Sequence, residues 1–169
     1  HKQDLSNPVG IDLGLIDLYY DSNGNHVEVP RYLRKKEKQL KKLQRRLSKA
    51  KKRSKEYYKL LKALSKTHYR IKCMRLDYLH KASNLLLKES DLIIHEELQI
   101  SKMMRRPKKK QAKDGTYLPN GAKYKSMLNK SIADAGWGKF LSILSYKAEE
   151  QNKRVLSVDP SYTSQRCYM

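Results

Sequence analysis

The fold is decided by an N-terminal stretch of sequence, VGIDLGLIDLYYDSNGNHVEV at residues 9–29. Its apolar runs predict three short strands, at 9–13, 15–20 and 26–29. The Asn23-Gly24 pair predicts a tight turn, because it accepts the positive φ angles that short hairpins require. Since tight turns join strands that run in opposite directions, we expect these three strands to be antiparallel.

The apolar period changes after Pro30, which marks the start of a helix. Apolar residues then recur mainly in steps of three, four and seven, as they do along one narrow seam of a helix. The first group is Leu33, Leu40, Leu43 and Leu47, and the second is Tyr57, Leu60, Leu64, Thr67, Ile71, Met74, Tyr78, Ala82 and Leu85. The pattern lapses between the two groups. Residues 31–90 therefore predict two long helices that fold back as an antiparallel hairpin, similar to a coiled coil.

The rest of the chain extends the predicted sheet. Apolar runs predict strands at 92–96 and 154–158, and residues 131–152 predict an amphipathic helix. Residues 101–130 contain prolines and glycines among many basic residues, and predict a flexible or partly helical loop. Helical crossovers join parallel strands, so the last two strands are added in parallel beside the first.

This order of elements is that of an α/β fold with a ribonuclease H-like (RuvC) mixed sheet. We expect residues 1–30 and 91–169 to form that part, with the helical hairpin of residues 31–90 inserted after the third strand.

Positive charge is concentrated in two segments. The chain carries a net charge of +21, of which residues 31–89 contribute +18, residues 101–130 contribute +9, and the remainder −6. Dense Lys and Arg favour a polyanionic partner, most commonly nucleic acid. The alternative is a solvated, charged helical surface with no ligand.

Two acidic residues fall at chemically notable places in the predicted sheet. Asp12 lies in the first strand between two glycines, and Glu96 ends the neighbouring parallel strand. Carboxylates on adjacent strands can hold Mg²⁺ or Mn²⁺ for phosphodiester hydrolysis. The alternative is that Asp12 is a turn or cap residue, and we assign Asp17, Asp91 and Glu97 mainly to such structural roles.

The two cysteines do not form a site by themselves. Cys73 falls among apolar residues of the second predicted helix and is expected in the core, and Cys167 has no second ligand nearby. Two cysteines are too few for a disulfide framework, and the chain has no apolar run long enough to cross a membrane. We expect a cytoplasmic protein without a membrane partner.

Seven motifs together resemble the RuvC-like domain of the OrfB/TnpB family, whose members are transposon-associated nucleases related to type V CRISPR effectors. The motifs follow the family's order along essentially the whole chain, although each alone is modest. They are Val9-Gly10-Ile11-Asp12-Leu13-Gly14, Pro30-Arg31-Tyr32-Leu33-Arg34-Lys35, Lys42-Leu43-Gln44-Arg45-Arg46-Leu47-Ser48, Asp77-Tyr78-Leu79-His80-Lys81, Ile93-Ile94-His95-Glu96-Glu97-Leu98, Lys130-Ser131-Ile132-Ala133-Asp134-Ala135-Gly136-Trp137 and Val158-Asp159-Pro160-Ser161-Tyr162-Thr163-Ser164-Gln165-Arg166-Cys167.

The resemblance implies an RNA-guided, metal-dependent DNA endonuclease. Asp12 matches the first catalytic carboxylate of the family and Glu96 the second, although Glu97 stands where the family usually has Asp. Cys167 matches the first of four zinc ligands. The other ligands, the third catalytic Asp and the closing helix of the sheet would follow it. We therefore expect this chain to expose apolar surface on one sheet face, to bind no Zn²⁺, and to bind nucleic acid without cutting it.

The expected partners are DNA and, in full-length members of the family, a guide RNA. The resemblance also implies a nucleoid-associated protein of prokaryotic origin. The best candidates for phosphate contacts are Lys42, Arg45, Arg46, Lys49, Lys52 and Arg53 on the hairpin and Arg105, Arg106, Lys108, Lys109 and Lys110 on the loop. The alternative function is a non-catalytic nucleic-acid-binding remnant or a repurposed repressor.

Overall fold

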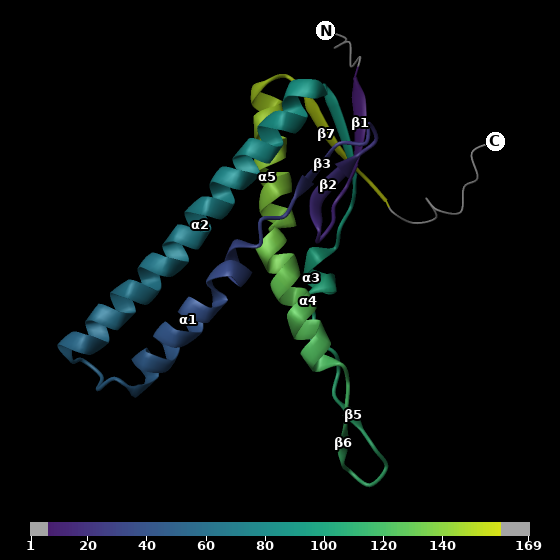
Figure 1. Ribbon diagram of the computed structural model, residues 1–169. Helices are drawn as coiled ribbons and strands as arrows, with labels where there is room; N and C mark the ends of the chain where they lie inside the picture. Colours follow the sequence, from purple (N-terminus) through teal and green to yellow (C-terminus); the bar gives the residue numbers. More distant parts are fainter. Residues whose placement is uncertain (1–6, 160–169) are drawn as a thin grey trace.

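The computed structural model describes residues 7–159 and shows an α/β fold around one mixed five-stranded sheet (Figure 1). The strands of this sheet are β1 (Pro8–Asp12), β2 (Asp17–Asp21), β3 (His26–Glu28), β4 (Leu92–Glu96) and β7 (Arg154–Val158). The helices are α1 (Tyr32–Lys49), α2 (Lys55–Glu89), α3 (Ile100–Met103), α4 (Ala122–Ala135) and α5 (Trp137–Glu150). A separate hairpin joins β5 (Lys110–Gln111) to β6 (Tyr117–Leu118).

The sheet has the strand order β3-β2-β1-β4-β7, with β1 at its centre. β1 pairs with β2, and β2 with β3, in antiparallel fashion, whereas β1–β4 and β4–β7 are parallel pairs. The predicted directions of all five strands are confirmed, and strands 92–96 and 154–158 have the predicted bounds. Parallel pairing brings the carboxyl ends of β1, β4 and β7 to one edge of the sheet.

The second strand begins later than predicted, at Asp17 instead of residue 15. The preceding residues form the tight connection from β1, where the Gly14 amide donates a 3.3 Å hydrogen bond to the Leu18 carbonyl. A Cβ atom at Gly14 would lie 2.8 Å from the Asp17 carbonyl oxygen. Residues 15 and 16, which the apolar pattern assigned to the second strand, therefore belong to this tight connection at Gly14.

Helices cover one face of the sheet (Figure 1). The core on that face includes Leu18 and Ile93 from the strands and Leu86, Phe140 and Leu144 from α2 and α5. Apolar side chains on the opposite face are more accessible, because Tyr20, Leu156 and Val158 are 53 %, 50 % and 41 % exposed. The expected exposed apolar surface is therefore present.

α1 and α2 lie side by side and extend away from the sheet (Figure 1). The Ser54 hydroxyl begins α2 by accepting a 3.1 Å hydrogen bond from the Tyr57 amide. Leu40 of α1 and Leu60, Thr67 and Ile71 of α2 are buried. The two predicted helices and the first half of their seam are therefore confirmed.

The second half of the predicted seam is wrong at two positions, because Met74 and Leu85 are exposed. The separate prediction that Cys73 lies in the core is also wrong, since Cys73 is exposed. Beyond Ile71 the buried residues include Leu79 and Leu86 instead. A straight α-helix has 3.6 residues per turn, so its buried face gradually rotates away from a pattern that repeats every 3.5 residues. In addition, α2 changes packing partner here, from α1 to α5 and the sheet.

Residues 101–130 are more structured than a loop, because they contain α3, the β5–β6 hairpin and the start of α4. The predicted helix at 131–152 is in fact two helices. α4 begins at Ala122, and Gly136, with a φ of 73°, ends α4 and starts α5. Left-handed backbone of this kind suits glycine and interrupts a continuous helix.

The structure offers no candidate for a membrane-spanning helix within residues 7–159, since none there is both long and apolar enough.

Candidate functional site

Asp12 and Glu96 end adjacent parallel strands at the same edge of the sheet. Ile11 pairs with His95 in the β1–β4 ladder, so the next residue on each strand is one of the two acids. Both line one open cavity of about 400 Å³, together with Gly10, Ile11, Tyr20, Asp21, Ser22, Ile94, His95 and Val158. The structure thus brings the two predicted acidic residues together.

Strand alternation determines the direction of the Asp12 side chain. Val9, Ile11 and Leu13 are buried, whereas Asp12 is exposed. Successive side chains of a strand point to opposite faces, so Asp12 lies on the face away from the helices. The Ser22 amide donates to the Gly10 carbonyl at 2.9 Å, and the Gly10 amide donates to the Ser22 hydroxyl at 3.3 Å. These contacts hold β1 against the segment after β2 beside the acidic pair.

A third carboxylate in the cavity, that of Asp21, is already engaged. One of its oxygens accepts hydrogen bonds from the Asn23 and Asn25 amides at 2.9 and 2.7 Å, and the other accepts from the Asn25 side chain at 3.0 Å. Asp21 therefore stabilises the turn between β2 and β3. Asp17 lines a neighbouring hollow together with Asp12.

The donor set of the acidic pair fits a hard divalent cation. Two carboxylates in a solvent-open cavity provide the oxygen ligands that Mg²⁺ and Mn²⁺ prefer, and leave space for water ligands. Across residues 7–159, no group of three or more His, Cys, Asp or Glu side chains is placed to hold a metal ion. Cys167 lies outside the described residues.

The predicted phosphate-binding residues fall into two separate groups, and neither group lines the acidic cavity. Lys42, Arg45, Arg46 and Lys49 are exposed on α1, and Lys52 and Arg53 are exposed in the connection to α2. Arg46 is partly neutralised, since it pairs with Glu56 of α2 at 3.0 Å. The other predicted residues are exposed between α3 and the first residue of β5, and are Arg105, Arg106, Lys108, Lys109 and Lys110. Lys109 also lies 5.6 Å from the ring centre of Tyr117.

The start of α1 and the side of α4 form a further basic region that the sequence did not single out. Arg106 lines a cavity of about 560 Å³ there with Lys125 and Lys130 of α4. Lys130 donates a 2.9 Å hydrogen bond to Glu37 of α1. Hydrogen bonds from Lys130, and then from Lys41, lower the pKa of Glu37 to about 2. Arg106 was predicted as a phosphate contact, whereas Lys125 and Lys130 were only part of the loop or of a family motif.

Asp134 of α4 forms a buried junction beneath this basic region. Its Oδ1 atom accepts hydrogen bonds from the Leu33 amide at 3.2 Å and from the Arg75 guanidinium at 2.8 Å. The Asp134 side chain is 4 % exposed and that of Arg75 is 26 % exposed. Asp134 thereby connects the first turn of α1, the middle of α2 and the end of α4. Its Oδ2 atom is buried without a hydrogen-bond partner in the described chain.

Comparisons with known proteins cover nearly the whole chain. Residues 2–107 match the OrfB_IS605 family, described as "Probable transposase", and residues 137–169 match the "Cas12f1-like, TNB domain" family.

Two curated proteins are similar over 94 % of this chain. "Putative RNA-guided DNA endonuclease InsQ" of Escherichia coli (strain K12) is 36 % identical over 161 residues, which are 39 % of its own length. "Putative RNA-guided DNA endonuclease" of Streptomyces pristinaespiralis is 27 % identical over 158 residues, 35 % of its length. The chain thus spans less than two fifths of the length of these relatives. Because the first family match covers more than half of the residues, the chain belongs to the OrfB_IS605 family of probable transposases.

Proposed function

We propose that this chain is the RuvC-like part of an RNA-guided DNA endonuclease, with Asp12 and Glu96 as the ligands of Mg²⁺ or Mn²⁺. The observation that carries the proposal is the position of both carboxylates at the ends of adjacent parallel strands, in one open cavity. The names of the two relatives and a sheet order compatible with a ribonuclease H-like fold support it.

The two acidic residues have a chemical role in the proposed phosphodiester cleavage. The Asp12 and Glu96 carboxylates would hold a divalent cation at the sheet edge and partly neutralise its charge. A divalent cation held there would lower the pKa of a bound water molecule and would stabilise the negative charge on the phosphate. The open cavity leaves room for the phosphate group, and the Ser22 hydroxyl and Tyr20 flank the acids.

The two basic groups provide affinity for the nucleic acid. The residues of α1 and its connection to α2, and those around the β5–β6 hairpin, would contact phosphates and position the strand without reading its sequence. In this proposal the α1–α2 hairpin of residues 31–90 is an arm inserted into the nuclease part. Salt screens such contacts strongly, so affinity should fall as salt concentration rises.

We further propose that the 169-residue chain binds nucleic acid without cutting it. Two carboxylates are fewer ligands than a two-metal site normally uses, and no third ligand joins them within residues 7–159. Mg²⁺-dependent cleavage of single- or double-stranded DNA by the purified chain would contradict this part. The same observation favours the second candidate function, a non-catalytic nucleic-acid-binding protein.

Calorimetric titration with Mn²⁺ tests the proposed metal ligands. We expect one bound ion per chain, and a loss of affinity of at least about tenfold in Asp12→Asn and in Glu96→Gln, because each removes one anionic ligand.

Glu97→Gln is the matched control, since Glu97 is adjacent in sequence and exposed but does not line the cavity. It should bind Mn²⁺ as the parent chain does. Equal Mn²⁺ affinity in all four proteins would rule out Asp12 and Glu96 as ligands.

A further inference from the structure

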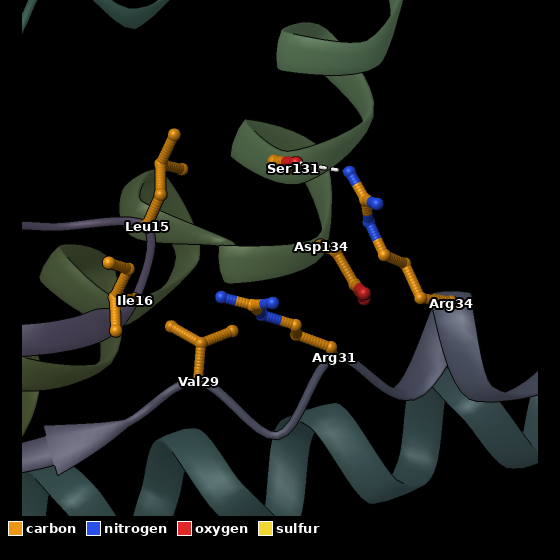
Figure 2. A pocket seen from close by; sticks show the side chains of 7 residues that line it. All are labelled: Leu15, Ile16, Val29, Arg31, Arg34, Ser131 and Asp134. Atoms are coloured by element: carbon orange, nitrogen blue, oxygen red, sulfur yellow. Dashed lines mark hydrogen bonds between the residues drawn. The ribbon is translucent and has the colours of Figure 1, made fainter.

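We propose that the cavity beside Asp134 holds a ribose–phosphate unit of RNA and distinguishes RNA from DNA by the 2′-hydroxyl group. The cavity is lined by Arg31 and Arg34 at the start of α1, by Ser131 and Asp134 of α4, and by three apolar side chains (Figure 2). The inference adds a binding site to the proposed function. It rests on the proposed function, because it assumes that the chain binds nucleic acid.

The cavity has a net positive charge. Arg75 already compensates the carboxylate of Asp134 through a 2.8 Å ion pair, so the charges of Arg31 and Arg34 remain. Arg34 donates one hydrogen bond, to the uncharged Ser131 hydroxyl at 3.0 Å. The Arg31 side chain has no hydrogen bond or ion pair within residues 7–159. Two guanidinium groups without carboxylate partners at one cavity favour a phosphate group.

The same cavity also has a hydrogen-bond acceptor that lacks a donor. Asp134 is 6 % exposed, and its Oδ2 atom is buried without a partner. In Figure 2 the carboxylate of Asp134 lies between the side chains of Arg31 and Arg34. A buried carboxylate oxygen without a donor is unfavourable, and a ligand that brings a hydroxyl group there relieves this.

These two requirements together identify the ligand class. The backbone of DNA would place acceptor oxygens beside the Asp134 carboxylate and would supply no donor, because neither its phosphodiester nor its deoxyribose carries a free hydroxyl group. In RNA, the 2′-hydroxyl group is attached next to the phosphodiester and can donate to Oδ2 while the arginines hold the phosphate. The cavity volume of about 160 Å³ suits a five-membered sugar ring, since cavities near 150 Å³ bind benzene. The base would project outside.

Oδ2 is covered by neighbouring side chains in this structure, so the ligand reaches it only when those side chains move. Arg31 and Arg34 are exposed, and exposed side chains change rotamer within picoseconds to nanoseconds. The inference requires that such a movement towards the phosphate gives the ribose access to the carboxylate.

The test compares three short single-stranded oligonucleotides of one sequence, made of RNA, 2′-O-methyl RNA and DNA, by fluorescence anisotropy at constant salt. The 2′-O-methyl RNA keeps the sugar pucker of RNA but lacks the hydroxyl donor. We expect the 169-residue chain to bind RNA at least about tenfold more tightly than the other two, as for a hydrogen bond to a charged acceptor.

Two double variants locate the preference. Arg31→Gln/Arg34→Gln should bind all three oligonucleotides with similar affinity. Lys42→Gln/Arg45→Gln, which removes two charges from the exposed face of α1, should weaken all three equally and keep the preference for RNA. All four substituted residues are exposed, and thermal melting checks that both variants stay folded.

Three outcomes would overturn the inference. Equal affinity of the parent chain for the three oligonucleotides would rule out the 2′-hydroxyl contact but would leave the proposed function intact. Full retention of the RNA preference in Arg31→Gln/Arg34→Gln places the contact elsewhere. If the chain binds none of the oligonucleotides, the inference and the nucleic-acid binding in the proposed function are both wrong.

Discussion

The carboxylate of Asp134 carries much of the connection between the helices. It accepts the Leu33 amide at the first turn of α1 and the Arg75 guanidinium of α2, while buried under α1. Removing one partner of a buried ion pair leaves the other charge without compensation, which is far more destabilising than loss of a surface pair. The junction therefore matters for the position of the basic region as well as for stability.

We predict that Asp134→Ala lowers the free energy of unfolding by about 2–4 kcal/mol, because Arg75 and the Leu33 amide both lose their acceptor. Urea unfolding measures this as a lower midpoint with an unchanged slope. Asp77→Ala is the control. It removes an exposed pair with Lys81 on α2 and should change stability by less than about 0.5 kcal/mol. Equal effects of the two substitutions would contradict the role of Asp134.

α1 and α4 are joined a second time by Glu37, whose pKa the hydrogen bonds from Lys130 and Lys41 lower from 4.5 to about 2. Because the pKa is lower in the folded chain, this contact stabilises the fold above pH 4.5, and the contribution is lost as the pH falls towards 2. We expect Glu37→Gln to be slightly less stable than the parent chain at neutral pH. The two should become equal near pH 2.

Urea midpoints of the two proteins across this pH range test the prediction. Glu89→Gln, which removes another exposed helical acid, controls for the change in net charge. A stability difference between Glu37→Gln and the parent chain that does not vary with pH would show that the ionised carboxylate is not its source.

The five strands of the main sheet could be predicted from the sequence because each is a short apolar run bounded by turn residues, whereas β5 and β6 are only two residues long and were not predicted. The division between α4 and α5 could not, since a single glycine is tolerated within a helical pattern. Gly136 favours glycine because its φ is 73°, a backbone conformation that other residues rarely adopt. Space does not exclude a side chain there, since a Cβ atom would make only ordinary contacts, 3.4 Å from Arg75 Cδ and 3.6 Å from Leu79 Cδ1.

The same contrast applies to the candidate sites. Asp12 and Glu96 could be predicted, because strand order alone brings the ends of two adjacent parallel strands together. The contact between Asp134 and Arg75 spans 59 positions and follows no local period. Only the tertiary structure creates it. The same holds for the cavity at Arg31 and Arg34, where the start of α1 meets α4 and the residues between β1 and β2.

At the scale of the whole molecule, the basic residues proposed to bind phosphates are separated from the acidic pair proposed to bind the metal ion. The acidic pair lies on the sheet, whereas the α1–α2 hairpin and the β5–β6 hairpin extend away from it (Figure 1). This arrangement suits a nuclease part in which a long nucleic acid is held by distant contacts while one phosphate reaches the sheet edge. Such contacts act through counterion release and have a measurable salt dependence.

We predict that Arg45→Gln weakens binding to DNA of different sequences by the same factor. It should also make the plot of log affinity against log salt shallower by about one unit. Lys139→Gln is the control, because Lys139 is an exposed residue of α5 outside both basic groups, and it should change neither quantity. A sequence-dependent loss in Arg45→Gln would indicate a contact to a base instead of a phosphate.

The most direct test of the acidic pair is anomalous X-ray scattering from a crystal of this chain soaked in Mn²⁺. Coordination by two carboxylates predicts a manganese peak between Asp12 and Glu96, within about 2–2.5 Å of an oxygen of each. The peak should be absent from crystals of Asp12→Asn soaked in the same way. No peak at this edge of the sheet, or one that persists in Asp12→Asn, would contradict the assignment of Asp12 and Glu96 as the metal site.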